Sequence, residues 1–343
     1  MSQSNRPSAA ILGCSGTRLT AEERSFFAEA NPYGLILFSR NLGAPESIRR
    51  LTSDFREVVG REDAPVLIDQ EGGRVARLGP PNWPSLPAAG QIGALWKRDR
   101  EKGLLAARLQ GLAIAATIAP LGIDVACAPM CDVAAPGSDV SVIGDRSYGE
   151  IPSQVANLAA ATEQALRSVG IATTAKHAPG HGRATSDSHF QLPVVEAPLA
   201  NLLSDLAPFI AVKEAPFFMT AHIVYRHLDP DLPATCSRKC LDWLRLETGF
   251  TGAILSDDLA MKALNGPIRD RAAAAISAGC DALLYCPGDM RGNIAAIEGA
   301  GPAGDRLEKT WQNWSSSRQM TFDDDAFLLA AELWAVLDEI VLQ

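Results

Sequence analysis

Eight short apolar runs, each followed by a stretch of helical period, constrain the fold of this 343-residue chain more than any other feature. Each run has the length and the aliphatic or β-branched composition of a buried strand. The runs lie at 9–13, 34–38, 65–69, 122–126, 171–175, 217–222, 251–258 and 281–285. Eight alternations of strand and helix predict an α/β fold of the TIM type, a (β/α)8 barrel.

A doubly wound open sheet is the alternative to the barrel. No Gly-x-Gly-x-x-Gly follows any of the eight runs, so the dinucleotide-binding version of that sheet has little support. No low-complexity linker divides the chain. We therefore expect a single domain over 1–343, with C-terminal helices from about 303 that follow the barrel.

Charge and cysteine content restrict the partners and the compartment. The formal net charge is −9 and the pI is near 5.1, which argues against a nucleic-acid or membrane partner. The N-terminus has no apolar signal segment, and the seven cysteines are an odd number, so we expect a reduced, cytoplasmic protein and a monomer. The apolar window 104–123 contains Arg108 and Gln110, which favours a core helix over a membrane span.

Acidic side chains end two of the predicted strands. Asp69 ends the third and is followed by Gln-Glu-Gly-Gly-Arg, while Asp257 and Asp258 end the seventh. Either group could be structural, as a turn with a surface ion pair or a helix N-cap. A carboxylate at a strand end can also accept two sugar hydroxyls. Because neighbouring strand residues point apart, we expect one of the two adjacent aspartates to reach a pocket and the other to orient a neighbour.

All five histidines lie between 177 and 227, and three of them fall in the stretch Lys176-His-Ala-Pro-Gly-His-Gly-Arg-Ala-Thr-Ser-Asp-Ser-His189. Asp187 lies two residues before His189, where a carboxylate can fix the tautomer of the imidazole and stabilise its charged form. His177 and His181 have metal-pair spacing, but Pro179-Gly180 between them excludes the helix that would align them. A metal-dependent hydrolase remains an alternative, and His227 is interpreted as an ordinary loop residue.

Four motifs together resemble glycoside hydrolase family 3, and specifically its branch of bacterial, NagZ-type β-N-acetylhexosaminidases. They are Ile68-Asp-Gln-Glu-Gly-Gly-Arg-Val, Lys176-His-Ala-Pro-Gly-His-Gly, Asp187-Ser-His189 and Leu255-Ser-Asp-Asp-Leu-Ala-Met261. The resemblance implies a TIM-like barrel without a cofactor or a metal ion. The sequence departs from the family's pattern at Ala178, a position that is usually aromatic. We therefore expect looser packing beneath the loop that follows Ala178.

The resemblance also implies roles for individual residues. Asp257 matches the family's nucleophile, His189 its acid/base, and Asp187 the partner of that histidine. The positions that hold N-acetylglucosamine correspond to Asp69, Arg77, Arg146, Lys176 and His177. The implied activity is retaining removal of terminal N-acetylglucosamine from peptidoglycan fragments during cell-wall recycling. A β-glucosidase, an N-acetylglucosaminide phosphorylase and a sugar-binding barrel without catalysis are the further alternatives.

Overall fold

The computed structural model describes residues 6–137, 141–318 and 325–338, and its centre is a closed barrel of parallel strands. The strands follow one another around the barrel in sequence order, and β12 pairs with β1 through Leu12 and Tyr285 to close it. The predicted barrel is confirmed and the open sheet is excluded. Its strands are β1 (Ser8–Leu12), β2 (Pro32–Leu37), β3 (Val66–Ile68), β6 (Val125–Ala126), β7 (Ala172–Ala178), β9 (Phe217–Thr220), β11 (Ala253–Asp258) and β12 (Ala282–Tyr285).

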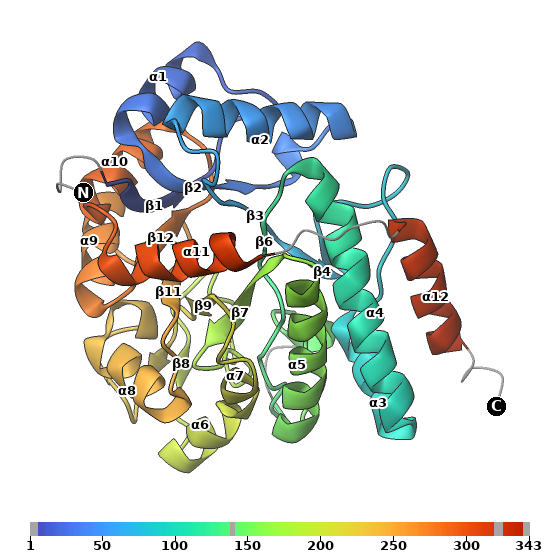
Figure 1. Cartoon of the computed structure of the whole chain (residues 1–343). Coiled ribbons are helices and arrows are strands. Elements are labelled where there is room, and N and C mark those ends of the chain that lie inside the picture. Colours follow the sequence, from blue (N-terminus) through green and yellow to red (C-terminus); the bar gives the residue numbers. More distant parts are fainter. Residues whose placement is uncertain (1–5, 138–140, 319–324, 339–343) are drawn as a thin grey trace.

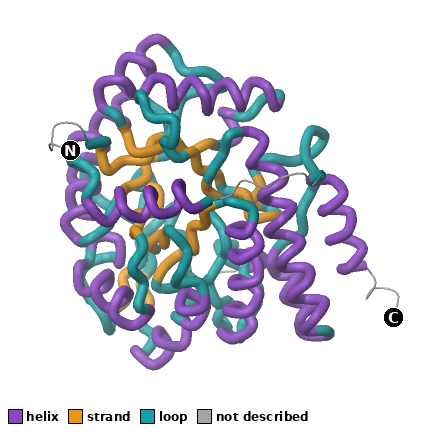
Figure 2. Tube along the Cα trace, viewed as in Figure 1, coloured by secondary structure: helices purple, strands orange, loops and turns teal. Residues whose placement is uncertain are grey.

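Helices surround the strands (Figures 1 and 2). They are α1 (Ala21–Ala30), α2 (Pro45–Val59), α3 (Ala89–Arg98), α4 (Arg100–Ile118), α5 (Pro152–Ser168), α6 (Leu199–Asp205), α7 (Ala207–Ala211), α8 (Arg238–Thr248), α9 (Ile268–Ala278) and α10 (Met290–Ala300). Local signals set their ends. Thr20 and Glu23 form a capping box at the start of α1, in which Glu23 N donates to Thr20 Oγ1 at 3.1 Å and Thr20 N donates to Glu23 Oε2 at 2.8 Å.

The apolar window around Arg108 and Gln110 forms α4, which packs against α3 and α5. The segment Arg100–Leu121 has the length and apolarity of a membrane span, but 67% of its apolar 18-residue window is buried inside the molecule. Gln110 turns inward and donates its Nε2 to the carbonyl oxygens of Glu71 and Pro87. The predicted core helix is therefore confirmed.

Helix α11 (Asp305–Ser317) crosses the N-terminal end of the barrel, in front of the strands in Figure 1. Leu307 and Trp311 of this helix belong to the same buried cluster as the inward-facing strand residues. Trp311 stacks on Phe217, and its Nε1 donates to Asp63 O at 2.7 Å. The barrel is thus filled and closed at this end, which leaves the C-terminal ends of the strands for a site. The last described helix, α12 (Ala326–Asp338), packs on α4 and α3.

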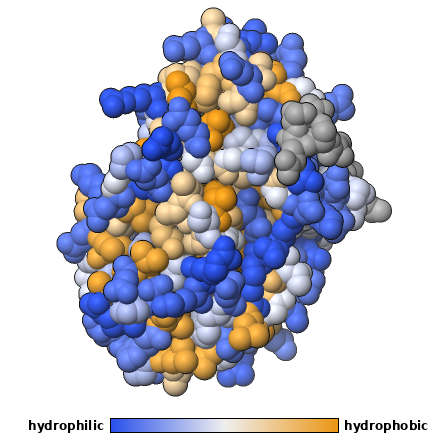
Figure 3. All heavy atoms as spheres, turned by 90° about the vertical axis from the view of Figure 1, so that its left-hand side faces the viewer, coloured by the Kyte–Doolittle hydropathy of each residue, from blue (hydrophilic) through white to orange (hydrophobic). Residues whose placement is uncertain are grey.

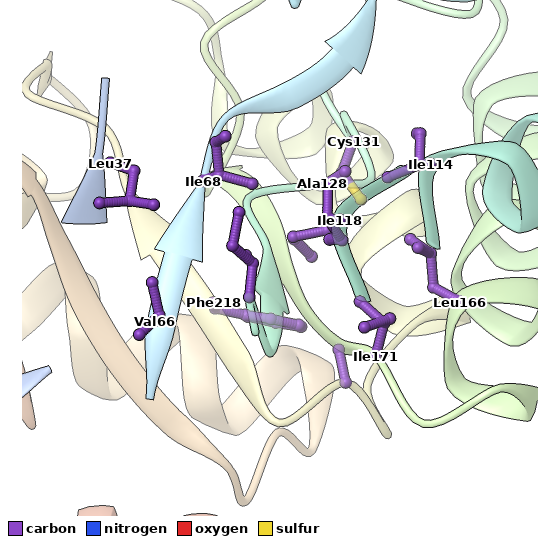
Figure 4. Packing of buried hydrophobic residues seen from close by; sticks show 14 of the residues in the cluster. Leu37, Val66, Ile68, Ile114, Ile118, Ala128, Cys131, Leu166, Ile171 and Phe218 are labelled. Carbon is purple, nitrogen blue, oxygen red and sulfur yellow. The ribbon is translucent and has the colours of Figure 1, made fainter. Parts of the chain in front are cut away.

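The main core lies between the barrel and its helices. Figure 4 shows strand residues such as Ile68 and Phe218 beside Ile114 and Ile118 of α4 and Leu166 of α5, all fully buried. Ala178 belongs to this core and is also fully buried. On the face seen in Figure 3, apolar residues lie in scattered groups among hydrophilic ones. All seven cysteines are free.

The structure differs from the predicted elements in several places. Strand β7 runs on to Ala178, so Lys176 and His177 lie inside it and not after it. The helical stretch before β9 is divided into α6 and α7 at Leu206, because Pro208 has no N–H to continue the first helix. Helix α3 was not predicted. Two small paired sheets were also not predicted: the hairpin β4 (Gln70–Gly72)–β5 (Val75–Ala76) and the pair β8 (Val194–Val195)–β10 (Val224–Tyr225).

Candidate active site

A cavity of about 310 Å³ opens at the C-terminal end of the barrel. Its inner wall includes the strand residues Ile36, Met219 and Leu284. Every side chain for which the sequence analysis predicts a role lines this one cavity: Asp69, Arg77, Arg146, Lys176, His177, Asp187, His189 and Asp257. A larger groove of about 710 Å³ lies beside α11, and none of these eight residues lines it.

The two aspartates at the end of β11 have different surroundings. Asp258 Oδ1 accepts hydrogen bonds from Ala260 N at 3.0 Å and Cys286 N at 3.1 Å, so it holds the turn after the strand. The carboxylate of Asp257 accepts a hydrogen bond from Asp258 N at 2.7 Å. Asp258 therefore orients the backbone, as expected of one of the two aspartates. The expectation that only one of them reaches a pocket is wrong, because both Asp257 and Asp258 line the cavity.

Asp257 is held in its ionised form. Burial by itself favours the neutral acid, but the nearby His177 and His222 rings outweigh it, and the pKa of Asp257 lies below its usual value. His222 is fixed behind the aspartates, with Nδ1 2.7 Å from Thr235 Oγ1 and Nε2 3.1 Å from Asp258 O. The cavity thus contains a carboxylate that is a ready nucleophile at neutral pH.

Five charged side chains form a continuous chain of ion pairs, here called the charged wall. Four of them line another side of the cavity, and the fifth, Glu71, links Lys176 to Arg146. Lys176 Nζ lies 2.8 Å from Asp69 Oδ1 and 2.6 Å from Glu71 Oε1. Arg77 contacts the other oxygen of Asp69 at 3.1 Å. Arg146 binds both carboxylate oxygens of Glu71, at 2.8 Å and 3.0 Å. Because such pairing compensates for the loss of water, all five groups can remain charged in a largely buried wall.

The pKa values of this wall follow from its pairing. Burial raises the pKa of Asp69, but Lys176 and Arg77 lower it more, so it lies well below its usual range. Burial acts in the same way on Glu71, and Arg146 and Lys176 bring its pKa to about 2. Lys176 is 2% exposed, and the two carboxylates keep its pKa above the usual value despite burial. The wall therefore offers fixed donors and acceptors to a polar ligand.

The β4–β5 hairpin places Arg77. The Gln70 side chain spans the hairpin, because its Oε1 accepts from Arg77 N at 2.9 Å and Leu78 N at 3.0 Å while its Nε2 donates to Leu78 O at 2.9 Å. The turn between the two strands contains Gly73 with φ +55°, a conformation that favours glycine. The hairpin thus follows Asp69 and leads to Arg77, and both of these charged side chains line the cavity.

Asp187 and His189 form a hydrogen-bonded pair at the cavity mouth. Asp187 Oδ1 is 2.7 Å from His189 Nδ1 and also accepts from His189 N at 2.8 Å. The side chain of His189 is 61% exposed, which leaves its other ring nitrogen open to a substrate. A carboxylate on one nitrogen and a free second nitrogen are what proton transfer by histidine requires.

The remaining histidine contacts bear on the metal alternative. His177 Nδ1 lies 2.7 Å from Asp132 Oδ2, and His181 Nε2 lies 3.0 Å from Ser188 Oγ. In the described ranges 6–137, 141–318 and 325–338, no group of three or more His, Cys, Asp or Glu side chains is arranged to hold a metal ion. One ring nitrogen of each of these two histidines is therefore used in a hydrogen bond to another side chain.

Three residues of the site were missed by the sequence analysis. Glu71 lies within the Asp69 motif, and Asp132 and His222 follow barrel strands, so strand-end position was the available signal. Their importance lies in partners that are distant in sequence: Arg146 for Glu71, and His177 for Asp132. Single-sequence reasoning has no access to such pairs.

A parallel barrel with an ionised aspartate in a polar cavity, and a histidine–aspartate pair at its mouth, defines a glycoside-hydrolysing barrel enzyme. The comparisons with known proteins place it more closely. Residues 7–312 match the family described as "Glycosyl hydrolase family 3 N terminal domain". The chain belongs to glycoside hydrolase family 3, and it is similar to β-hexosaminidases of the NagZ type.

Individual relatives agree with this assignment. The chain is 40% identical over 283 residues to a β-hexosaminidase of Alkalilimnicola ehrlichii, covering 80% of each chain. It is 36% identical over 333 residues to a β-hexosaminidase of Methylococcus capsulatus, covering 95% of this chain and 96% of the relative. The native NagZ structure from Neisseria gonorrhoeae superposes with a TM-score of 0.83 at 30% identity, covering 97% of this chain and 96% of that one. The same protein has been solved in complex with N-trifluoroacetyl-D-glucosamine.

Proposed function

We propose that the protein removes terminal, non-reducing N-acetylglucosamine by two-step retaining hydrolysis, with Asp257 as the nucleophile and His189 as the acid/base. The observation that carries the proposal is the presence in one cavity of an ionised carboxylate and a carboxylate-backed histidine with a free ring nitrogen. Retaining glycosidases need a nucleophile and a proton donor of this kind, although two carboxylates are the usual pair.

In the first step, a carboxylate oxygen of Asp257 bonds to the anomeric carbon while the glycosidic C–O bond breaks. His189 gives its proton to the departing oxygen, and Asp187 stabilises the charged imidazole that does so. In the second step, the neutral imidazole takes a proton from water, and the water oxygen replaces Asp257 at the anomeric carbon. The aspartate is released as a carboxylate, and the sugar keeps its original configuration.

The charged wall supplies the sugar subsite. Asp69 presents acceptor oxygens to hydroxyl groups, and Arg77 and Arg146 present N–H donors from the same side. Lys176 and His177 complete the predicted set, and their internal ion pairs and hydrogen bonds fix their positions before a ligand arrives. Such preorganisation reduces the entropy lost on binding. The N-trifluoroacetyl-D-glucosamine complex of the gonococcal relative supports an N-acetylated sugar as the ligand of this subsite.

The resemblance to the NagZ branch supports the substrate class. We propose N-acetylglucosamine linked to 1,6-anhydro-N-acetylmuramic acid, with or without its peptide, as the natural substrate. The reaction would then belong to peptidoglycan recycling in the cytoplasm, carried out by a monomer. We further propose that residues 1–343 act as one catalytic domain.

Two assays test the activity. The first compares 4-nitrophenyl β-N-acetylglucosaminide with the corresponding β-glucoside, each with and without EDTA. We expect turnover of the N-acetyl substrate alone and no effect of EDTA. Preference for the glucoside would indicate a β-glucosidase. Loss of activity with EDTA would indicate a metal-dependent hydrolase, and no turnover of either substrate would indicate a sugar-binding protein. Release of sugar 1-phosphate in phosphate buffer would indicate a phosphorylase.

The second assay tests the covalent step. A 5-fluoro-N-acetylglucosaminyl fluoride slows hydrolysis of the glycosyl-enzyme, so the intermediate accumulates and adds the mass of one sugar to the protein. We expect peptide mapping to place that mass on Asp257, and no label on the Asp257→Ala variant. A label on another carboxylate would show that the nucleophile is wrongly assigned.

A further inference from the structure

The segment 187–189 carries the proposed acid/base pair, yet it lies at the surface. His189 is 61% exposed in its side chain, and its ring contacts Asp187 within the same segment. A proton donor works only when it is held within hydrogen-bond reach of the departing oxygen. The position of this segment relative to Asp257 must therefore be set by contacts outside the pair itself.

Ser188, the middle residue of the segment, supplies such a contact. It is 2% exposed, in contrast to its neighbours, and its Oγ lies 3.0 Å from His181 Nε2. Its carbonyl oxygen accepts from Ala263 N at 3.2 Å. Among the residues that the structure describes, the bond to His181 is the one side-chain hydrogen bond that links 187–189 to another segment.

His181 is in turn fixed to the barrel. It is 2% exposed, and its backbone N donates to Asp132 Oδ1 at 2.6 Å. The next residue, Gly182, lies so close to Val133 O that an added Cβ would be 1.7 Å from it, so this part of the loop is tightly packed. Burial lowers the pKa of His181 to about 4, and the ring is neutral at pH 7. Its Nδ1 is buried without a hydrogen-bond partner in the described part of the chain, which is a cost that an apolar side chain would avoid.

The anchor of His181 is shared with the sugar subsite. Asp132 is fully buried, and its carboxylate also accepts from His177 N at 3.1 Å and contacts His177 Nδ1 at 2.7 Å. The His177 and His181 rings meet edge to face, with their centres 5.7 Å apart. One buried carboxylate thus fixes both a wall of the cavity and the residue that contacts Ser188.

We propose that His181 is a positioning residue, whose hydrogen bond to Ser188 sets the place of the acid/base pair relative to Asp257. This inference rests on the proposed function, because it requires His189 to be the proton donor. It assigns no contact with the sugar to either residue. Its consequence is specific: loss of the bond should impair protonation of the leaving group and spare the attack on the anomeric carbon.

The experiment compares kcat/KM on two substrates that differ in their need for a proton. 4-Nitrophenyl β-N-acetylglucosaminide has a good leaving group, whereas N,N′-diacetylchitobiose has a poor one. We expect Ser188→Ala to lose at least ten times more kcat/KM on the disaccharide than on the aryl substrate. His181→Gln keeps a hydrogen-bonding amide near the position of Nε2, so its loss on the disaccharide should be smaller than that of Ser188→Ala.

Two further variants distinguish failure of this inference from failure of the proposed function. Ser168→Ala removes a partly buried hydroxyl that bonds to Ala165 O at 2.8 Å at the end of α5, and it should leave the ratio of the two substrates unchanged. His189→Ala should discriminate between the substrates more strongly than Ser188→Ala. An equal loss on both substrates in Ser188→Ala alone, with a lowered Tm, would mean that Ser188 is merely structural and would overturn the inference. An equal loss in His189→Ala would overturn the proposed acid role as well.

Discussion

Lys176 Nζ lies 2.6 Å from Glu71 Oε1, and this contact joins the two halves of the charged wall. Lys176 comes from β7, whereas Glu71 comes from the β4–β5 hairpin. Arg146 donates two hydrogen bonds to the same carboxylate of Glu71. Glu71 therefore has a structural role that is as central to the site as that of any residue facing the sugar.

Glu71→Gln should lower the free energy of unfolding by about 3 kcal/mol, because it leaves two buried cations with an uncharged partner. Urea denaturation monitored by circular dichroism measures this loss. Glu46→Gln is the matched control, since Glu46 pairs with Arg49 at 2.8 Å but is 77% exposed, and its effect should be below about 0.5 kcal/mol. Equal effects of the two variants would contradict a structural role for Glu71.

The effect of Glu71→Gln should also depend on pH. The pKa of Glu71 is depressed from an ordinary value of 4.5 to about 2, so its stabilisation is complete above about pH 4.5 and is lost as the pH falls towards 2. The difference in unfolding free energy between wild type and variant should therefore be constant from pH 7 to pH 5 and should shrink between pH 4.5 and pH 3. Urea titrations at each pH measure it, and a difference that does not change with pH would exclude this linkage.

Asp257→Ala should reduce kcat on 4-nitrophenyl β-N-acetylglucosaminide by a factor on the order of 10³ or more, because the covalent route is lost. Asp258→Asn is the comparison variant: it keeps an oxygen acceptor for Ala260 N and Cys286 N, so we expect a fall in kcat of less than about tenfold. Steady-state kinetics of the two purified variants measures the difference. The reverse order would assign the nucleophile to Asp258.

His189→Ala should affect substrates according to their leaving groups. A poor leaving group needs a proton, so kcat/KM on the disaccharide should fall by about 10²-fold or more, while the value on the nitrophenyl substrate should fall far less. A plot of kcat/KM against the pKa of a series of phenol leaving groups measures this, and it should be steeper for the variant than for wild type. Parallel plots would show that His189 does not donate the proton.

Trp311→Ala tests how α11 closes the barrel. The side chain is 3% exposed, stacks on Phe217 and donates to Asp63 O, so its loss should cost about 3–5 kcal/mol of stability. Because the cavity lies at the opposite end, the activity of the molecules that remain folded should stay within about twofold of wild type. Thermal unfolding and active-site titration on the same samples separate the two effects.

The sequence was sufficient to predict the barrel because parallel strands buried on both faces are continuous apolar runs. It failed where tertiary contacts decide. Lys176 and His177 follow the predicted strand at 171–175, yet they lie in β7 because the strand stays paired with β9 as far as Ala178. Helix α3 was not predicted because its glycines interrupt the helical sequence pattern. Gly93 is required there because an added Cβ would lie 1.7 Å from Tyr148 O, and such a packing constraint leaves no periodic signal.

The site was predictable to a similar degree. The eight residues that meet in the cavity belong to strand ends and to the loops that follow them, and barrel topology brings those together. Glu71 and Asp132 were missed because their role is to hold other residues, and the partners they hold are 75 and 45 positions away in the sequence. Supporting contacts of this kind depend on the folded structure more than on any local pattern.

Helix α11 closes the N-terminal end of the barrel, and this closure affects the order in which products leave the cavity. Leu307 and Trp311 fill the far end of the barrel, and the cavity lies at the C-terminal ends of the strands, where Asp187 and His189 line it. In the reaction we propose, the aglycone leaves on this side before water reaches the glycosyl-enzyme, and the freed sugar leaves on the same side before the next substrate arrives. That reaction would remove one terminal sugar per binding event, and its monosaccharide product would compete with the substrate for the same space.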